Sequence, residues 1–400
     1  MFIYLPSINN LIRFSRVILC FILINNIFPC LGQTNRDSIY SIDANLKQLI
    51  TDISSKKIIA LGESTHGTKE FTILRAEIVK SLVSQYGFNA FLLEADFMPC
   101  KAINEFILTG KGDPETLLLN VRLWPWIHQD FLDLIIWMKD YNQLHPSGKV
   151  QFFGMDSQYS KIYATKEIIF QQYPEKAQDF FDIVEGKEKR NIKIKMLRQL
   201  LNQSLLSSTF DLEWYYFIHC QINKLAQLPP KVYNARDENM ARMAEIIQLK
   251  QGINTKMMIW THNEHINKKG SSLQDRTGMG HHLSVNHPDD FVAIGMDFKE
   301  GSFMAINYEE KSMHKPEAFQ LKPLETTLAS GLNFTDKTIN VIDCIKIDKE
   351  ILNSIGSIYV HSPKKGDNYY TKIKGNKNFD YLIIIEKSTP IRILSNYGVK

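Results

Sequence analysis

The sequence predicts an α/β protein with a mostly parallel β-sheet that helices cover on both faces. Short apolar runs of the kind found in buried strands alternate with segments whose apolar residues recur at helical spacing. Several of these runs end in a carboxylate or an imidazole, as strands do where they deliver side chains to a crevice. The chain has 400 residues, of which 44% are apolar and 22% charged, so it can build a substantial core.

The expected strands are apolar runs bounded by turn residues. In chain order they are KKIIAL (56–61), NAFLLEAD (89–96), KVQFFGMD (149–156), TKMMIWTHNEH (255–265) and DDFVAIGMDF (289–298). A helix should follow the first run, because Phe71, Leu74, Ile78 and Leu82 share a helical period that Gly87 closes. A second clear helical pattern covers DFLDLIIWMKDYN (130–142).

Residues 160–250 differ in character from the segments around them. They are rich in Lys, Gln and Leu, contain no convincing strand and are broken once by Pro229-Pro230. We expect a helical insertion or subdomain there, within one catalytic domain that spans 33–400. After residue 340, short β-like runs such as YLIIIE (381–386) alternate with turns.

The first 32 residues have the pattern of a secretory signal peptide. Arg13 and Arg16 precede the apolar run VILCFILINNIF, which is too short for a comfortable transmembrane helix. We expect cleavage near Gly32 and a secreted or periplasmic mature chain that does not insert stably into the membrane. The alternatives are an uncleaved anchor, a cytoplasmic chain, or a lipoprotein attached at Cys30, for which Pro29 is a poor preceding residue.

Charge and cysteine content exclude several classes of protein. The 47 basic and 43 acidic residues are spread without long blocks, so no nucleic-acid partner is expected. Beyond the first 32 residues the cysteines are Cys100, Cys220 and Cys344, whose wide spacing makes neither a disulfide framework nor a zinc motif. We expect buried, inert thiols.

Four predicted strands end in residues that carry carboxylate or imidazole groups. The first strand runs into GESTHGTKE (62–70), where two glycines are expected to let the chain turn sharply. Singly, such residues are often caps or solvated loop residues. Together they indicate one crevice, because the carboxyl ends of parallel strands meet at the same edge. The residues concerned are Glu63, His66, Glu94, Asp156, His262 and His265.

Two arginines lie on apolar helix faces. Arg75 shares the stripe of Phe71 and Leu82, so it points toward the buried side, where an unpaired guanidinium would be costly. Arg236 precedes the apolar face of a helix expected over 237–245. Arg75 either forms an internal salt bridge or clamps an anion in the crevice. Arg236 either extends to solvent at the helix start or acts as a second clamp.

These residue types permit two mechanisms. In the first, a histidine acts as general base on water, a carboxylate orients it, and a second His or Arg stabilises the oxyanion. In the second, His66, Glu94, His262 and His265 bind a metal that activates the water, although HNEH lacks the helical HExxH spacing of zinc proteases. Ser64 is not expected to be a nucleophile, because GESTHG does not match the Gly-x-Ser-x-Gly elbow.

From about residue 40 to 310 the chain resembles the erythromycin esterases. The resemblance rests on the order and spacing of GESTHGTKEF, FLLEAD, WMKDYN before VQFFGMDSQ, ARDENMA, and WTHNEHI before MGHHL. It implies a three-layer α/β/α fold with a helical part over an open cleft. It also implies metal-independent ester hydrolysis without a cofactor, the best-known substrates being 14-membered macrolide lactones.

The resemblance implies roles for individual residues. His66 matches the general base, and Glu63 and Glu94 match acids that orient or support it. His262 and His265 match the paired histidines of the family, and Arg75 and Arg236 match its arginines. We expect Arg236, Asp156 and Trp126 to contact the substrate. His128 departs from the acidic or hydroxylic residue expected nearby, and the signal-like start is unexpected for a cytoplasmic resistance enzyme.

Three hypotheses follow. The leading one is an esterase that opens macrolide lactones and so confers macrolide resistance, with a small-molecule ester and water as its only partners. The second is a metal-dependent hydrolase or peptidase that uses the same His and Glu residues. The third is a module that binds haem or another small ligand without catalysis.

Overall fold

The computed structural model describes residues 44–205, 210–226, 232–270, 277–307, 315–321, 324–335, 338–360 and 369–398. The chain divides into two compact units, Met1–Ser41 and Ile42–Lys400, and all described residues belong to the second. The expected signal peptide over 1–32 therefore lies outside the described residues, as does Cys30. Within the described part, no helix combines the length and the apolar character needed to cross a bilayer.

The described residues form a nine-stranded sheet whose main path has the order β3-β2-β4-β1-β5-β11-β7. Neighbouring strands from β3 to β11 are parallel, and β7 pairs antiparallel with β11. These strands are β1 (Ile58–Leu61), β2 (Ala90–Asp96), β3 (Gln151–Asp156), β4 (Met257–Trp260), β5 (Phe291–Asn307), β7 (Ile339–Asp343) and β11 (Tyr381–Ser388). The predicted α/β class with a mostly parallel sheet is confirmed.

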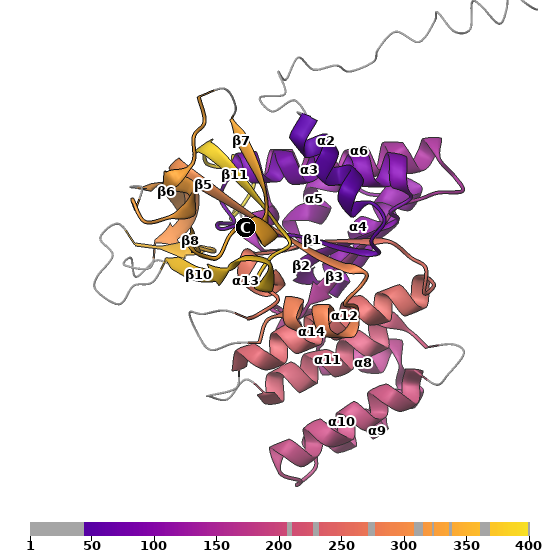
Figure 1. Cartoon of the computed structure of the whole chain (residues 1–400). Helices are drawn as coiled ribbons and strands as arrows, with labels where there is room; N and C mark the ends of the chain where they lie inside the picture. The colour runs from indigo at the N-terminus through magenta and orange to yellow at the C-terminus, as the bar shows by residue number, and fades with distance from the viewer. Residues whose placement is uncertain are drawn as a thin grey trace, which may run out of the picture. The chain divides into compact units, whose positions relative to one another are not determined.

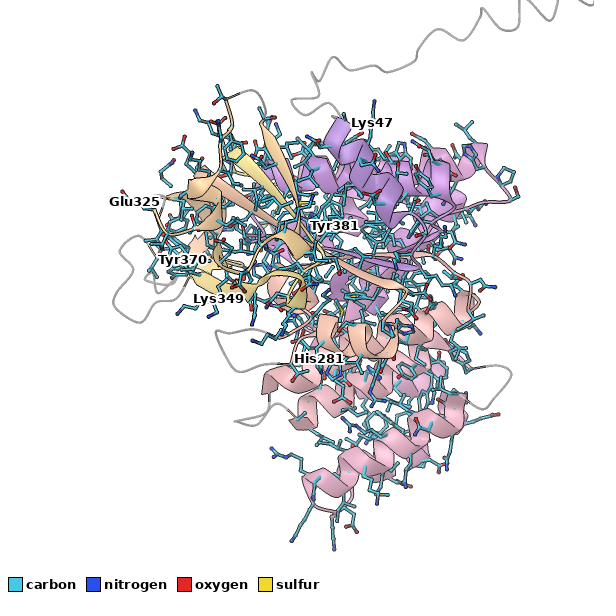
Figure 2. The ribbon with its side chains drawn as sticks, in the orientation of Figure 1. Lys47, His281, Glu325, Lys349, Tyr370 and Tyr381 are labelled. Carbon is cyan, nitrogen blue, oxygen red and sulfur yellow. The ribbon has the colours of Figure 1, made fainter. Side chains whose placement is uncertain are left out.

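Strand β5 is longer than predicted and joins two parts of the sheet. Its second half pairs with β6 (Pro316–Leu321) and with β9 (Ile358–Tyr359). A separate two-stranded sheet of β8 (Lys349–Asn353) and β10 (Tyr370–Lys374) lies beside it, where Lys349 and Tyr370 are labelled in Figure 2. The C-terminal β-like runs of the sequence thus extend the same domain, and Figure 1 shows them at one side of the sheet.

Helices cover both faces of the sheet (Figure 1). One group is α2 (Ala44–Ile53), α3 (Lys69–Tyr86), α4 (Phe97–Thr109), α5 (Pro114–Leu119) and α6 (Gln129–Leu144). The other is α7 (Ser160–Tyr163), α8 (Lys166–Gln172), α9 (Pro174–Glu185), α10 (Arg190–Leu205), α11 (Leu212–Ala226) and α12 (Val232–Gln251). Short helices α13 (Asn263–Ile266), α14 (Met279–Asn286) and α15 (Leu328–Gly331) follow strands or precede them.

Helices α11 and α12 of the second group pack against the sheet, and α10 packs against α11. Tyr216 of α11 and Met240 of α12 belong to the same apolar core cluster as Leu92 of β2 and Ile259 of β4. Strands β1 and β4 are buried along their whole length, which explains why their sequences are continuous apolar runs. The helical segment therefore covers a sheet face and lies next to the strand ends.

Candidate active site

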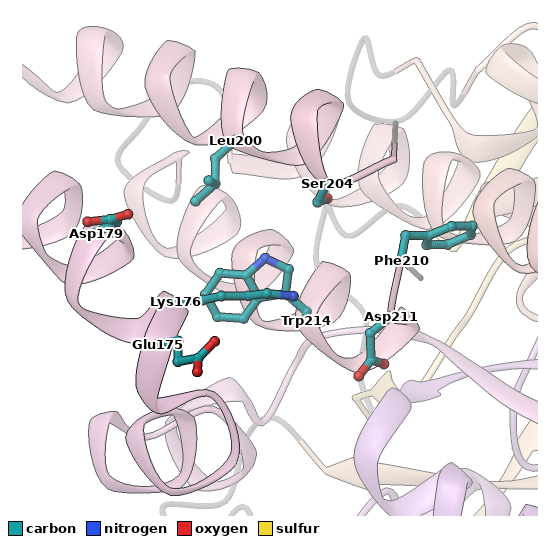
Figure 3. Close-up of a pocket in the computed structure, with 8 residues that line it drawn as sticks. All are labelled: Glu175, Lys176, Asp179, Leu200, Ser204, Phe210, Asp211 and Trp214. Atoms are coloured by element: carbon teal, nitrogen blue, oxygen red, sulfur yellow. The ribbon is translucent and has the colours of Figure 1, made fainter. Parts of the chain in front are cut away.

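The carboxyl ends of β1, β2 and β4 open into a cleft of about 550 Å³. The predicted residues that line this cleft are His66, Glu94, Trp126, Arg236, His262 and His265. The cleft is within the range of typical ligand pockets. A smaller cavity of about 250 Å³ lies among α9, α10 and α11 (Figure 3), and none of the predicted site residues lines it.

His66 is held in place by a buried chain of charged groups. Its Nδ1 atom lies 2.8 Å from Oε1 of Glu63, so Nδ1–H donates to this carboxylate. The other oxygen of Glu63 accepts from the guanidinium of Arg75. Burial lowers the pKa of Arg75 to about 10 against the opposing effect of Glu63, so Arg75 stays charged at neutral pH. The arrangement fixes the tautomer of His66 and leaves Nε2 with no partner among the described residues.

The two glycines of the turn are required because neighbouring segments pack closely against them. A Cβ atom on Gly62 would lie 2.3 Å from Oδ1 of Asn263, and one on Gly67 would lie 1.9 Å from the carbonyl oxygen of Met304. Neither glycine has a positive φ. The chain does turn at His66 and Gly67, as expected, but the glycines serve close packing against α13 and β5 and not a left-handed backbone conformation.

Glu94 is a buried carboxylate with four hydrogen-bond donors. Oε1 lies 2.7 Å from Nη2 of Arg236 and 3.2 Å from Nε2 of His265. Oε2 accepts from the hydroxyl of Thr261 at 2.6 Å and from the backbone N–H of His262 at 3.1 Å. Burial opposes its ionisation, but His265, Arg236 and His66 together hold the pKa of Glu94 well below its usual range. Glu94 is therefore an ionised anchor for the cations around it.

Arg236 carries its charge into the cleft from α12. Its Nε and Nη2 atoms bind the carboxylate of Asp156 at 2.5 to 3.1 Å, and Nη2 also donates to Glu94. Nη1 has only the ring of His265 within hydrogen-bond distance, at 3.3 Å, among the described residues. Helix α12 begins at Val232, so Arg236 is not at the helix start as predicted, and the solvent-extended alternative was wrong.

The paired histidines have opposite protonation states. Burial and the neighbouring His66 lower the pKa of His262 to about 4, so it is neutral. Both of its ring nitrogens are occupied, Nε2 by the carbonyl of Ser64 and Nδ1 by the backbone N–H of Glu264. Burial disfavours charge on His265, but Asp237 and Glu94 raise its pKa to about 10, so it is a cation. Its Nδ1 lies 2.6 Å from Oδ1 of Asp237.

Asp96 connects the cleft to the helical segment. Its carboxylate accepts from the backbone N–H of Tyr159 at 2.9 Å and from the hydroxyl of Tyr216 in α11 at 2.9 Å. Tyr159 lines the cleft. Burial, reinforced by Asp156, raises the pKa of Asp96 to about 7. Asp96 thus holds one wall of the cleft against α11.

A family model described as erythromycin esterase matches residues 83–185 and 206–388. The chain belongs to the erythromycin esterase family. The match includes Glu94, Arg236, His262 and His265, and it begins after the turn that holds Glu63 and His66. Membership of this family indicates a hydrolase.

Three related proteins illustrate how distant the relationship is within the erythromycin esterase family. Erythromycin esterases type II and type I of Escherichia coli are 28% and 30% identical over 114 and 117 residues, which are 28% and 29% of this chain. Those matches span 26% and 28% of the two enzymes, so the chain matches about a quarter of their length. The putative hydrolase YbfO of Bacillus subtilis is 21% identical over an alignment of 379 residues that covers 82% of both chains.

Two solved structures share the fold. A succinoglycan biosynthesis protein has a TM-score of 0.71 at 22% identity and covers 89% of this chain and 94% of its own. A mutant of the erythromycin esterase EreC in its open conformation has a TM-score of 0.63 at 16% identity and covers 88% and 96%. At these identities the likeness concerns the fold, which is the α/β fold of an erythromycin esterase.

Three of the predicted site residues do not line the cleft of this erythromycin esterase family member. Arg75 is 1% exposed and lies over the ring of Trp260 at 4.0 Å, so the internal salt bridge is correct and the anion clamp is wrong. Asp156 is 3% exposed, and its carboxylate is occupied by Arg236. Glu63 is fully buried. None of the three lines the cleft. Glu63 binds His66, Asp156 binds Arg236, and Arg75 binds Glu63, so they hold the cleft residues in place.

Three further predicted residues have supporting positions. Trp126 lines the cleft, and its ring packs edge-on against His66 at 5.4 Å while Nε1 donates to the backbone carbonyl of Glu94. Ser64 lies outside the cleft lining, and its carbonyl is the acceptor for His262. His128 is 1% exposed, and burial lowers its pKa to about 3, so its departure from the family pattern affects packing and not the cleft surface.

The donor set does not fit a divalent metal ion. Both nitrogens of His262 and His265 are already engaged, and His265 is protonated. The oxygens of Glu94 already accept from four donors, those of Arg236, His265, Thr261 and the backbone N–H of His262. Arg236 is also a cation, which would repel a metal ion. Among the residues that the structure describes, no three His, Cys, Asp or Glu side chains are arranged to hold a metal.

Sequence reasoning missed two parts of the site. Asp237, the partner of His265, stands next to Arg236 in ARDENMA, and its place on a helix beside an inward arginine was the available signal. The second part is the segment 354–358 with Tyr369, which forms a wall of the cleft. Gly356 accepts from the backbone N–H of His66 at 3.2 Å, so this wall also fixes the turn that carries His66.

Proposed function

We propose that this protein is a metal-independent ester hydrolase in which His66 acts as the general base. The observation that carries the proposal is the His66–Glu63–Arg75 chain, which presents one imidazole nitrogen at the floor of a cleft. A neutral imidazole with a buried carboxylate on Nδ1 can accept a proton at Nε2 and is stabilised once it is charged. Of the three histidines that line the cleft in the described part of the chain, His66 is suited to this role, because His262 is engaged at both nitrogens and His265 is already protonated.

The reaction begins with a water molecule between Nε2 of His66 and the ester carbonyl. As the water oxygen bonds to the carbonyl carbon, Nε2 takes one proton from it, and the carbonyl oxygen becomes an oxyanion. The tetrahedral intermediate then breaks its bond to the ester oxygen, and the imidazolium returns the proton to this leaving alkoxide. The products are a carboxylic acid and an alcohol, and His66 is neutral again.

Arg236 is our candidate for oxyanion stabilisation. Its Nε and Nη2 atoms donate to the carboxylates of Asp156 and Glu94, which fix the plane of the guanidinium. Its Nη1 atom can therefore donate to a substrate oxygen. A rigid cation placed before the reaction contributes more than a mobile one, because no reorganisation is needed in the transition state. The charged His265, held by Asp237, lies 3.3 Å from Nη1 and is a second cation beside it.

For the substrate we propose the lactone ester of a 14-membered macrolide, whose hydrolysis would confer macrolide resistance. Two observations support this choice: membership of the erythromycin esterase family and a cleft of about 550 Å³ with apolar walls that include Leu123, Trp124 and Ile358. A cleft of this size suits a bulky ligand.

The substrate proposal is tested by incubating the purified protein with erythromycin and recording mass spectra over time. We expect a product heavier by one water molecule. A panel of 14-membered macrolides that all remain intact would overturn the macrolide proposal. Esters of other alcohols, assayed in parallel, separate the general esterase proposal from the macrolide proposal.

Metal independence has its own test. Turnover should be unchanged after dialysis against a chelator, and metal analysis should find no stoichiometric metal. Loss of turnover that is restored by a divalent metal would favour the metallohydrolase instead. Absorbance spectra after haem addition should show no specific binding band, which separates the enzyme from a haem-binding module.

We further propose that the mature protein is exported by removal of residues 1–32. The support is the basic, then apolar, then small-residue pattern of that segment. N-terminal sequencing of the protein recovered from the periplasm or medium of an expressing bacterium tests this proposal. An intact Met1 in the cytoplasmic fraction would contradict it.

A further inference from the structure

Glu264 is a charged residue of the cleft that has no counter-ion in the described part of the chain. The two cations that line the cleft are each paired: Arg236 faces Glu94 and Asp156, and His265 faces Asp237. Glu264 lines the same cleft, and among the residues that the structure describes its carboxylate binds only a neutral hydroxyl. Its negative charge is therefore open to a ligand.

One oxygen of this carboxylate lacks a hydrogen bond. Oε1 accepts from the hydroxyl of Ser354 at 2.8 Å, whereas Oε2 is buried and has no partner among the described residues. Buried carboxylate oxygens are normally satisfied, because an unpaired one loses its hydration without compensation. A ligand that brings positive charge to Glu264 would remove this cost.

The surrounding charges also favour a cation. In the same site the two cations Arg236 and His265 are held by three carboxylates, those of Glu94, Asp156 and Asp237. The excess of carboxylates persists at neutral pH, because the pKa of Glu94 is held well below its usual range. A cleft whose fixed charge is negative attracts positively charged substrates and repels anionic ones.

Aromatic side chains line the same cleft as this carboxylate. Tyr369 lines the cleft, and its backbone carbonyl accepts from the N–H of Ser354 at 2.7 Å, so it lies beside the hydroxyl that orients Glu264. Trp124 and Tyr159 also line the cleft. Aromatic faces combined with a carboxylate are the common surroundings of bound ammonium groups.

We propose that Glu264 selects ester substrates that carry a protonated or quaternary amine. The inference rests on the proposed esterase function and narrows its substrate class. The backbone N–H of Glu264 donates to Nδ1 of His262, whose ring lies 5.1 Å from that of His66. Glu264 is therefore anchored beside the two histidine rings at which the ester is proposed to bind.

The test uses two esters of the same acid that differ in one atom. A choline ester carries a quaternary nitrogen, and the 3,3-dimethylbutyl ester has a carbon in its place. With wild-type protein, kcat/KM should be higher for the choline ester. Glu264→Gln should lower kcat/KM for the choline ester about tenfold, which is the effect of losing one partly screened charge contact, and leave the neutral ester unchanged.

Two variants serve as controls. Glu77→Gln removes one carboxylate from the outer side of α3, where Glu77 pairs with Lys80 away from the cleft, and should change neither ester. Ser354→Ala removes the hydroxyl that orients Glu264 and should weaken the preference for the choline ester without abolishing it. Equal effects of Glu264→Gln on both esters, or none on either, would overturn the inference while the esterase function stands.

The preference for a cation can also be measured as ligand binding, without any ester hydrolysis. Tryptophan fluorescence is followed while choline or 3,3-dimethylbutanol is added to wild-type protein and to Glu264→Gln. Choline should bind the wild type more tightly than the neutral alcohol, and the variant should lose this preference. If no ester is hydrolysed but the preference is present, the esterase proposal fails and the cation site holds. If choline and the alcohol bind alike, the cation site is contradicted.

Discussion

The Nδ1 atom of His66 lies 2.8 Å from Oε1 of Glu63, and Arg75 holds the other oxygen of that carboxylate. Glu63 is fully buried and His66 is 9% exposed, so the contact is shielded from water while the imidazole still lines the cleft. This relationship sets which nitrogen of His66 carries the proton. It also predicts which variants of His66, Glu63 and Arg75 should change the rate of catalysis and which should change the stability of the fold.

Glu63→Gln should lower kcat strongly and change KM little. The amide keeps the shape of the side chain but loses the charge that orients the imidazole and stabilises its protonated form. We expect a decrease of roughly 100-fold in kcat, at the lower end of what general base catalysis contributes. Steady-state kinetics on an ester substrate measure this, with Glu77→Gln as the control. A variant with unchanged kcat would contradict the role of Glu63.

Arg75→Met should destabilise the fold by about 3–5 kcal/mol, because Glu63 would remain as an unpaired buried carboxylate. The double variant Glu63→Gln with Arg75→Met should recover most of this loss and remain inactive. Unfolding in urea, followed by circular dichroism, measures the free energy of unfolding of each protein. If the double variant is as unstable as the sum of the single variants, the two side chains do not form the pair that the structure shows.

The two histidines of the HNEH segment should titrate at opposite ends of the pH range. His265 should stay protonated up to a pKa of about 10, because Asp237 and Glu94 outweigh its burial. His262 should stay neutral down to a pKa of about 4, because burial and His66 disfavour its charge. Nitrogen NMR of labelled imidazoles reports both the charge and the tautomer. Two histidines that both titrate near pH 6.5 would contradict these environments.

Asp96→Asn should become more stable relative to wild type as pH rises from 4 to 7. The pKa of Asp96 is raised from 3.8 to about 7 by burial and by Asp156, so the wild-type fold disfavours the ionised form. Above the unfolded pKa this costs the wild type at most about 1.4 kcal/mol per pH unit, and the cost levels off above the folded pKa. Asparagine has no charge to bury and avoids this cost. Thermal unfolding at several pH values measures the difference, and a difference independent of pH would contradict the prediction.

The sheet and the catalytic strand ends could be predicted because they depend on local patterns. Buried parallel strands such as β1 and β4 are continuous apolar runs, and residues at their carboxyl ends must meet. The inward direction of Arg75 also followed from helical spacing alone. Its partner did not, because spacing gives the direction of a side chain and not the residue it reaches.

The C-terminal wall of the cleft could not be predicted from the sequence. Residues 354–358 reach the catalytic turn through backbone contacts, such as that between His66 and Gly356, which leave no side-chain pattern. Asp156 showed the opposite problem. Its position at a strand end suggested contact with substrate. In the structure its carboxylate is instead occupied by Arg236, which lies 80 residues later in the sequence, on helix α12. Contacts between distant segments decide such cases.

The most direct test of the account compares the rate of ester hydrolysis by wild type and by His66→Ala under the same conditions. The substrate is any ester that the wild type cleaves, and circular dichroism confirms that the variant unfolds cooperatively. We predict a rate lower by roughly 10²- to 10⁴-fold, because removal of the general base leaves water unactivated. A folded His66→Ala protein that hydrolyses the ester as fast as wild type would contradict the central claim.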